Sequence, residues 1–190
     1  MDVFLFQKFN DLAGGQGLFD GLVIFLASPF SYLVMAVLLV AFFLPNLFAP
    51  AIAERTFRIG LLAGLVSAFF ARVVVKEIIV FFHDSPRPFE VLEGVNQIIA
   101  HGGMSSFPSG HAIFFFTLAT VLMFYSRGLG IFLLLSSILM ALSRVIAGIH
   151  WPSDVIAGAS FGILIGILTY VLLAGYVISK KGTSISRVQE

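Results

Sequence analysis

The sequence predicts an all-α fold, a polytopic membrane bundle of about five to six transmembrane helices with an N-terminal amphipathic helix. Composition is the first observation: 59% of the 190 residues are hydrophobic and only 11% are charged, whereas soluble domains carry about 25% charged residues. The mean hydropathy of +1.05 is the second. The third is that the apolar residues form runs long enough to cross a bilayer.

The first 27 residues are expected to form an interfacial segment. Apolar residues recur at Val3, Phe4, Leu5, Phe9 and Leu12, and a Gly-Gly-Gln-Gly break follows at 14–17. This pattern favours an amphipathic helix followed by a short apolar segment, Leu18–Leu26. Residues 18–26 could also be the lower part of a first span kinked at Pro29, and both alternatives stay open.

Five later segments are apolar enough to be spans, each approaching the roughly 20 residues that cross about 30 Å of hydrocarbon. They are Phe30–Leu47, Ile59–Phe82, Ala112–Tyr125, Leu129–Ala147 and Val155–Ile178. The third is short, and residues 109–112 can extend it. No internal repeat interrupts the chain, so we expect one membrane-embedded domain over 1–190, with its catalytic core at 59–178.

The basic residues predict the orientation of these spans. With five spans, Arg55, Arg58, Arg127, Lys180, Lys181 and Arg187 all fall on one side. That side should be cytoplasmic, because cytoplasmic loops are enriched in Lys and Arg. The other side receives the segments 83–108 and 148–153. We therefore expect a multi-pass protein of the plasma (inner) membrane whose functional groups face the extracytoplasmic side.

Polar clusters stand at the outer ends of these spans, at residues 85–89, 107–111 and 143–154. His150 and Asp154 are four apart, so a helix would place them on one face. A carboxylate there can hold one imidazole nitrogen as a donor and leave the other nucleophilic. His111 supplies a second imidazole, suited to protonating a leaving oxygen.

Donors for an anion accompany these histidines. Arg87 and Arg144 carry planar guanidinium groups that match phosphate oxygens. Ser109 and the Gly110 backbone N–H stand at the expected start of a helix, where the potential is positive. Two imidazoles, two guanidinium groups and one carboxylate indicate a phosphoryl site that needs neither metal nor cofactor. The chain has no cysteine and no basic run typical of nucleic-acid binding.

Three motifs make the sequence resemble the type 2 phosphatidic acid phosphatase family, whose pattern is Lys-x6-Arg-Pro, Pro-Ser-Gly-His and Ser-Arg-x5-His-x3-Asp. The second motif is matched by residues 108–111, and the third by Ser143, Arg144, His150 and Asp154. The first is matched only at Arg87 and Pro88. Val80 stands where the family has lysine, and Lys76 lies one helical turn deeper.

The resemblance implies a phosphohistidine mechanism. His150, oriented by Asp154, would attack phosphorus, and His111 would protonate the departing oxygen. Arg87, Arg144, Ser109, Gly110 and Lys76 would bind the phosphate, and Lys76 would do so only if it reaches outward from its deeper position. His83 is another candidate for the missing contact.

The segments 6–14, 18–20 and 87–89 look similar to undecaprenyl-diphosphatases of the bacitracin-resistance type. This similarity implies conversion of undecaprenyl diphosphate to undecaprenyl phosphate. Phosphate-binding motifs do not distinguish lipid tails, so a phosphatidic acid or phosphatidylglycerophosphate phosphatase stays an alternative, as does phosphate transfer between lipids. The expected partners are a polyprenyl or glycerol lipid phosphate and membrane lipid, and the sequence leaves the oligomeric state open.

A membrane transporter is the alternative from a different class. It predicts polar residues along the spans, yet the last three spans are almost wholly apolar away from their outer ends. Other polar residues have structural interpretations. Arg72 and Glu77 favour a structural ion cluster, His83, Asp84 and His101 favour solvated surface, and Gly158, Gly162 and Gly166 favour close helix packing.

Overall fold

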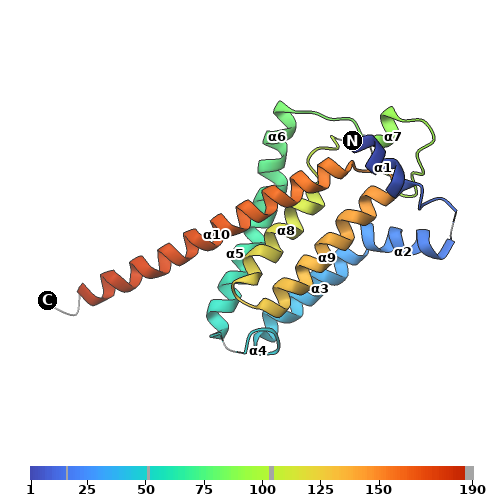
Figure 1. Ribbon diagram of the computed structural model, residues 1–190. Helices are drawn as coiled ribbons and strands as arrows, with labels where there is room; N and C mark the ends of the chain where they lie inside the picture. The colour runs from blue at the N-terminus through green and yellow to red at the C-terminus, as the bar shows by residue number, and fades with distance from the viewer. Residues whose placement is uncertain (16, 51, 103–104, 187–190) are drawn as a thin grey trace.

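The computed structural model describes residues 1–15, 17–50, 52–102 and 105–186, and every regular element in these ranges is a helix. The all-α prediction is therefore confirmed. In chain order (Figure 1) the elements are α1 (Asp2–Asn10), α2 (Gly17–Ala27), α3 (Phe30–Phe43), α4 (Pro45–Phe48), α5 (Glu54–Phe70), the π-helical turn η1 (Ala71–Val75), α6 (Lys76–Phe82), α7 (Pro88–Val91), α8 (Gly110–Met123), α9 (Arg127–Ile146) and α10 (Pro152–Ser186).

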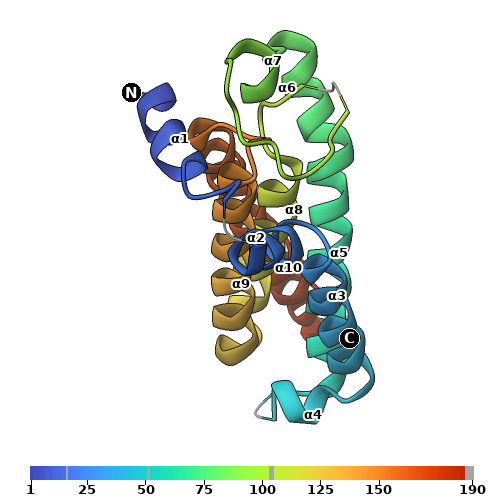
Figure 2. The same cartoon turned by 90° about the vertical axis from the view of Figure 1, so that its right-hand side faces the viewer.

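Helix α8 is the centre of the bundle, packed between α5, α9 and α10. Its side chains are buried almost all round, with Ile113, Leu118 and Leu122 fully enclosed. Such a helix is apolar on every face because every face meets another helix. Figure 2 shows α8 within the bundle, beneath the loops that carry α7.

The glycine stripe of α10 fits the close approach of α10 to α8. A Cβ on Gly162 would lie 2.7 Å from the carbonyl oxygen of Ile113, and one on Gly166 would lie 2.6 Å from the Cβ of Thr120. These separations leave no room for any side chain at either position. The small-residue stripe therefore brings the backbones of α8 and α10 together, as its spacing predicted.

By length and apolar composition, two of the described helices can cross a membrane: α9 and the Pro152–Ala174 part of α10. The span expected at 59–82 falls on α5, η1 and α6, which follow one another without a break, and it stays a prediction. The span expected at 112–125 is α8, which has only 14 residues. The expected total of five to six spans stays a prediction.

The N-terminal segment forms two helices with different surroundings. Helix α1 packs on α9 and α10, where Phe6 is buried and its ring lies 5.2 Å from that of Trp151. Helix α2 joins α3 through a 46° bend, and the two meet the length and composition criterion for a span only together. This arrangement fits the alternative of a first segment kinked near Pro29, while the interfacial position of α1 stays a prediction.

The bundle has two chemically different ends. The end of α6, α7, the start of α8 and the α9–α10 turn lie together at the top of Figure 1, and α4 lies at the bottom. Arg55 and Arg58 are in the first turns of α5, which follows α4, and Arg127 begins α9. Arg187 lies outside the described residues. The structure separates the basic end from the three motifs, and the orientation in the membrane stays a prediction.

Candidate active site

Hydrogen bonds tie the three motif-bearing segments together at one end of the bundle. Arg87 donates from its guanidinium to the carbonyl of Ile149 at 2.6 Å. The indole N–H of Trp151 donates to the carbonyl of Pro86 at 2.9 Å. The backbone N–H of Ser109 donates to the backbone carbonyl of Asp154 at 3.1 Å. The segments are far apart in sequence, and these bonds fix them as one unit.

The turn after α9 depends on a glycine. Gly148 has φ +80°, a left-handed conformation that glycine adopts without steric cost. A Cβ there would lie 2.9 Å from the carbonyl oxygen of Asn96, so the position also lacks space. The turn reverses the chain tightly and delivers Ile149 and His150 to the site.

His150 is held from one side of its ring. Its Nδ1 lies 3.3 Å from Oδ2 of Asp154, which also accepts from the backbone N–H of Trp151 at 2.8 Å and from the Ser106 hydroxyl at 2.5 Å. A carboxylate accepts and does not donate, so Nδ1 carries the proton. The other nitrogen, Nε2, is left with a lone pair that can act as a nucleophile.

Arg144 lies on the Nε2 side of His150. One terminal nitrogen donates to the carbonyl of Ala27, the last residue of α2, at 3.1 Å. The other lies 3.5 Å from Nε2 of His150 and 3.3 Å from Nε2 of His101. The Nε atom is buried and has no hydrogen-bond partner among the described residues. The bond to the carbonyl of Ala27 therefore does not use every donor of Arg144, because its Nε–H is left for a ligand.

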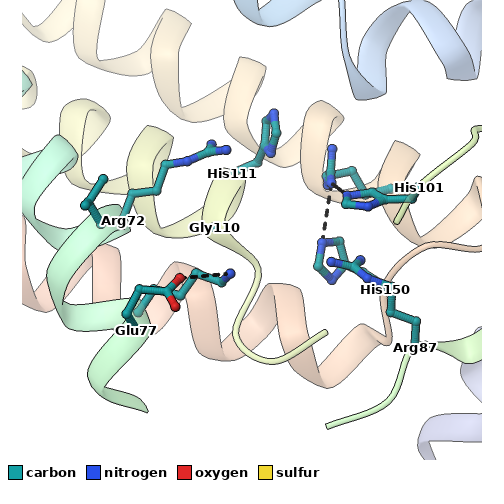
Figure 3. A pocket seen from close by; sticks show the side chains of 10 residues that line it. Arg72, Glu77, Arg87, His101, Gly110, His111 and His150 are labelled. Atoms are coloured by element: carbon teal, nitrogen blue, oxygen red, sulfur yellow. Dashed lines mark hydrogen bonds and ion pairs between the residues drawn. The ribbon is translucent and has the colours of Figure 1, made fainter. Parts of the chain in front are cut away.

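A cavity of about 390 Å³ opens in front of His150 and Arg144 (Figure 3). Its walls are Arg72, Val73, Lys76, Glu77, Arg87, His101, Gly110, His111, Arg144 and His150. Six residues expected from the sequence to form the site therefore surround one space: His150, His111, Arg87, Arg144, Gly110 and Lys76. Asp154 lies behind His150, and Ser109 is fully buried just before α8.

His111 occupies the first turn of α8 beside the cavity. Its ring lies against that of Phe115 one turn later, with centroids 6.4 Å apart, and it makes no hydrogen bond to another described residue. Figure 3 shows the ring between Arg72 and the His101–His150 side of the cavity. Both ring nitrogens are available to a ligand there, as a proton donor to a leaving oxygen requires.

Residues 60–176 match the family described as the PAP2 superfamily. The chain belongs to the PAP2 superfamily. This confirms the resemblance to type 2 phosphatidic acid phosphatases that the motifs indicated. The matched range contains all three motifs and excludes α1 and α2.

Similar proteins match this chain over most of its length. "Undecaprenyl-diphosphatase BcrC" of Bacillus subtilis is 26% identical over 170 residues, 90% of this chain and 83% of that protein. "Bacitracin transport permease protein BcrC" of Bacillus licheniformis is 29% identical over 171 residues, covering 90% and 79% respectively. The crystal structure of Aquifex aeolicus LpxE superimposes with a TM-score of 0.70 at 28% identity, over 88% of this chain and 93% of that one.

The departure from the first PAP2 motif has a structural counterpart at Lys76. The lysine lies one turn deeper than in the family pattern, yet it lines the cavity. It stands directly after η1, where the Lys76 N–H bonds to the carbonyl of Ala71, five residues back. Such π turns rotate the helix beyond them and are frequent at functional sites. Lys76 also pairs with its neighbour Glu77 at 3.6 Å.

Three further residues at the site were not expected from the sequence to act there. Arg72 lines the cavity and has no ion pair among the described residues, although a structural ion cluster was expected. His101 was expected at the solvated surface, yet it faces Arg144. Ser106 had no assigned role, and it holds Asp154. No motif marks these positions: His101 and Ser106 reach the site from a loop, and Arg72 lies in η1.

The charges around the cavity act on its imidazoles. Burial, followed by the nearby positive charges of Arg144 and Arg87, lowers the pKa of His150 well below its usual range. Burial and the same two arginines also lower the pKa of His101. Both rings are therefore neutral at pH 7. Nδ1 of His101 lies 3.2 Å from the carbonyl of Gly102, so it carries the proton and Nε2 accepts from Arg144.

Proposed function

We propose that this PAP2 phosphatase hydrolyses undecaprenyl diphosphate to undecaprenyl phosphate and inorganic phosphate at the extracytoplasmic face of the plasma membrane. The reaction would pass through a phosphohistidine on His150 and would need no metal ion. The phosphatase class follows from family membership. The lipid, the residue roles and the orientation are the proposed parts.

The arrangement of His150 is the observation that carries the chemistry. Its Nδ1 is held by Asp154 while Nε2 faces a cavity lined by three arginines and a lysine. Neutral Nε2 is the form that attacks phosphorus, and the surrounding cations stabilise the charge that spreads over the equatorial phosphate oxygens. The Nε of Arg144, which has no hydrogen-bond partner in the part of the chain that the structure describes, is positioned to donate to such an oxygen.

The proposed reaction proceeds in two displacements. Nε2 of His150 attacks the terminal phosphorus, and the bond from that phosphorus to the bridging oxygen breaks. His111 gives a proton to the departing undecaprenyl phosphate. Water then attacks the phosphohistidine while His111 takes a proton from it, the P–N bond breaks, and inorganic phosphate leaves. Asp154 stabilises the positive charge that the His150 ring carries in the intermediate.

Relatives support the choice of lipid. The Bacillus subtilis relative, whose name gives undecaprenyl diphosphate as its substrate, matches along 90% of this chain, beyond the 60–176 of the family match. The likeness to LpxE supports the fold and the phosphatase class. It does not favour undecaprenyl diphosphate over another lipid phosphate. The choice of substrate therefore rests on the relatives that match 90% of the chain. A second lipid phosphate is included in the test.

The direct test uses purified protein in detergent with EDTA present. Phosphate release is measured from undecaprenyl diphosphate and from phosphatidic acid, for the wild type, His150→Ala and the control His83→Ala. His83 is exposed near the site and does not line the cavity. Release from the diphosphate that survives EDTA, is abolished in His150→Ala and persists in His83→Ala supports the proposal. Turnover of phosphatidic acid alone would refute the lipid, and loss of activity with EDTA would refute metal independence.

Orientation can be tested separately, because the chain contains no cysteine. Single cysteines replace exposed residues at opposite ends of the bundle, Glu93 near the site and Arg127 at the start of α9. A maleimide that does not cross membranes is then added to intact cells. Labelling of the Glu93 variant alone supports an extracytoplasmic site, and labelling of the Arg127 variant alone would reverse the orientation.

A further inference from the structure

The cavity has a second group of cations besides Arg87 and Arg144, which lie near His150. Arg72 belongs to η1 and Lys76 begins α6, whereas Arg87, His101 and His150 stand on loops across the cavity. Figure 3 shows Arg72 on the far side of His111 from His150. The general acid proposed above therefore lies between two groups of cations.

The two groups differ in depth. Arg87, Arg144 and His150 are 3%, 4% and 3% exposed, so they form the enclosed floor of the cavity. The Lys76 side chain is 12% exposed, and Arg72 is exposed. A ligand that places one anionic group on the floor would have its next group beside Lys76 and Arg72 at the mouth.

We infer that Arg72 and Lys76 form a second phosphate subsite, which binds the lipid-side phosphate of a diphosphate substrate. The inference rests on the proposed function, because only a diphosphate substrate has a second phosphate that stays with the lipid. The terminal phosphate lies against His150, Arg87 and Arg144. The bridging oxygen then faces His111, and the second phosphate meets Arg72 and Lys76. The site is thereby selective for diphosphates over monophosphates.

The chemistry of the leaving group supports this placement. When the bond between the terminal phosphorus and the bridging oxygen breaks, negative charge accumulates on the lipid phosphate. A guanidinium and an ammonium beside that phosphate stabilise this charge more strongly in the transition state than in the bound substrate. A monophosphate ester has no charged group at that position and gains nothing from them.

The stems of both basic side chains pass close to Gly110. A Cβ on Gly110 would lie 3.4 Å from Cδ of Lys76 and 3.7 Å from Cγ of Arg72, so both stems pass over this glycine. Two residues of the mouth, Val73 and Glu77, also line a groove on the outer face of η1 and α6. The rest of that groove is apolar, formed by Val74, Ile78, Phe81 and Phe82. An isoprenoid chain leaving the second phosphate would meet this surface.

Binding measured without turnover tests the subsite. Methylenediphosphonate replaces the bridging oxygen of a diphosphate with carbon and cannot be hydrolysed there, and methylphosphonate provides one anionic group. Both are titrated calorimetrically into the wild type, Arg72→Gln, Arg72→Lys, Lys76→Gln and the control Arg127→Gln, all purified in detergent. Arg127 is exposed at the start of α9 and lies outside the cavity.

The wild type should bind the diphosphonate about tenfold or more tightly than the monophosphonate, the effect of one charge-assisted contact. Arg72→Gln and Lys76→Gln should each lose most of this preference while binding methylphosphonate within about twofold of the wild type. Arg72→Lys should keep part of the preference, and Arg127→Gln all of it.

Three results would overturn the inference: no preference in the wild type, an equal loss for both ligands in Arg72→Gln, or no change in either glutamine variant. Thermal unfolding of each variant identifies any that misfold, and the Lys76 variant then decides. A wild type that prefers the diphosphonate but releases no phosphate from undecaprenyl diphosphate would support the subsite and refute the lipid proposed above.

Discussion

Replacing Ser106 by alanine should slow the reaction without disturbing the fold. Ser106 is fully buried, and its hydroxyl donates to Oδ2 of Asp154 at 2.5 Å. The same oxygen faces Nδ1 of His150 at 3.3 Å. Ser106 does not line the cavity. It is therefore a positioning residue, which acts through Asp154 on the orientation and charge of the His150 ring.

The expected magnitude depends on the kind of bond that is lost. A hydrogen bond to a charged group contributes about 1.5–3 kcal/mol. If that stabilisation acts on the imidazole charge formed in the transition state, kcat should fall about tenfold to hundredfold. The Trp151 backbone N–H still donates to Oδ2 at 2.8 Å. Asp154 therefore keeps this donor and Nδ1–H of His150, and the effect should stay below that of Asp154→Asn.

The assay is the initial rate of phosphate release, measured for Ser106→Ala, Asp154→Asn and the double variant. If the hydroxyl acts through the carboxylate, Ser106→Ala should change the rate of Asp154→Asn by less than about twofold. Ser106→Thr keeps the hydroxyl and should recover part of the rate. Ser105→Ala is the matched control, because the Ser105 hydroxyl accepts from the backbone N–H of Ser85 and donates to the carbonyl of Phe107. Arg87 donates to the backbone carbonyl of Ser105, which alanine keeps.

An unchanged kcat in Ser106→Ala would refute this role for the hydroxyl. So would fully additive losses in the double variant, since additivity means that the two residues act independently. A fall in kcat accompanied by an equal fall in Ser105→Ala would point to general disturbance of the loop.

Three further perturbations test the described contacts. Burial and neighbouring arginines lower the pKa of His150, so the nucleophile stays neutral at pH values below about 6.5, the ordinary pKa of histidine. The acidic limb of log kcat/KM should therefore lie below pH 6.5, and a limb at or above that pH would contradict the assigned electrostatics. Gly162→Ala places a Cβ 2.7 Å from the carbonyl oxygen of Ile113 and should cost about 1–3 kcal/mol of stability in thermal unfolding, whereas Gly128→Ala meets open space and should not destabilise; equal transitions would argue against close α8–α10 packing. Asn10 is buried and bonds to Asn96 and to the Ile146 carbonyl, so Asn10→Ala should destabilise by about 2 kcal/mol while exposed Asn46→Ala changes little, and unfolding that is unchanged in Asn10→Ala would show that α1 is not held there.

The helical core could be predicted because its information is local. Apolar runs bounded by polar residues predicted both ends of α9 and the start of α10 to within a few residues. The glycine stripe predicted a close helix contact because small residues at four-residue spacing let two helix backbones approach in a membrane. The bend between α2 and α3 was less predictable, since Pro29 fits both a kinked span and a separate segment.

The site could be predicted where the residues of a motif are close in sequence, and less well where loops fold over it. His150 lies two residues before α10 and Asp154 lies in its first turn, so the shared helical face predicted for them was wrong, but their four-residue separation still brings Nδ1 of His150 to Asp154. Ser106 and His101 reach the site from the long segment between α7 and α8, whose path depends on contacts made by Arg144 and Asp154. The residues that flank Ser106 and His101 in the sequence do not predict those contacts.

The first motif shows why a departure in sequence need not be a departure in geometry. Counting residues places Lys76 one turn too deep for the family pattern. The π turn before it rotates the helix, and the cavity extends as far as Arg72. Lysine and arginine have long stems, so a one-turn offset of the Cα still brings the charge to the site. A site for one phosphate has no need of a further cation such as Arg72. The offset and the extra arginine are consistent with each other if this cavity is longer than a monophosphate requires, which is the property that the phosphonate titrations measure.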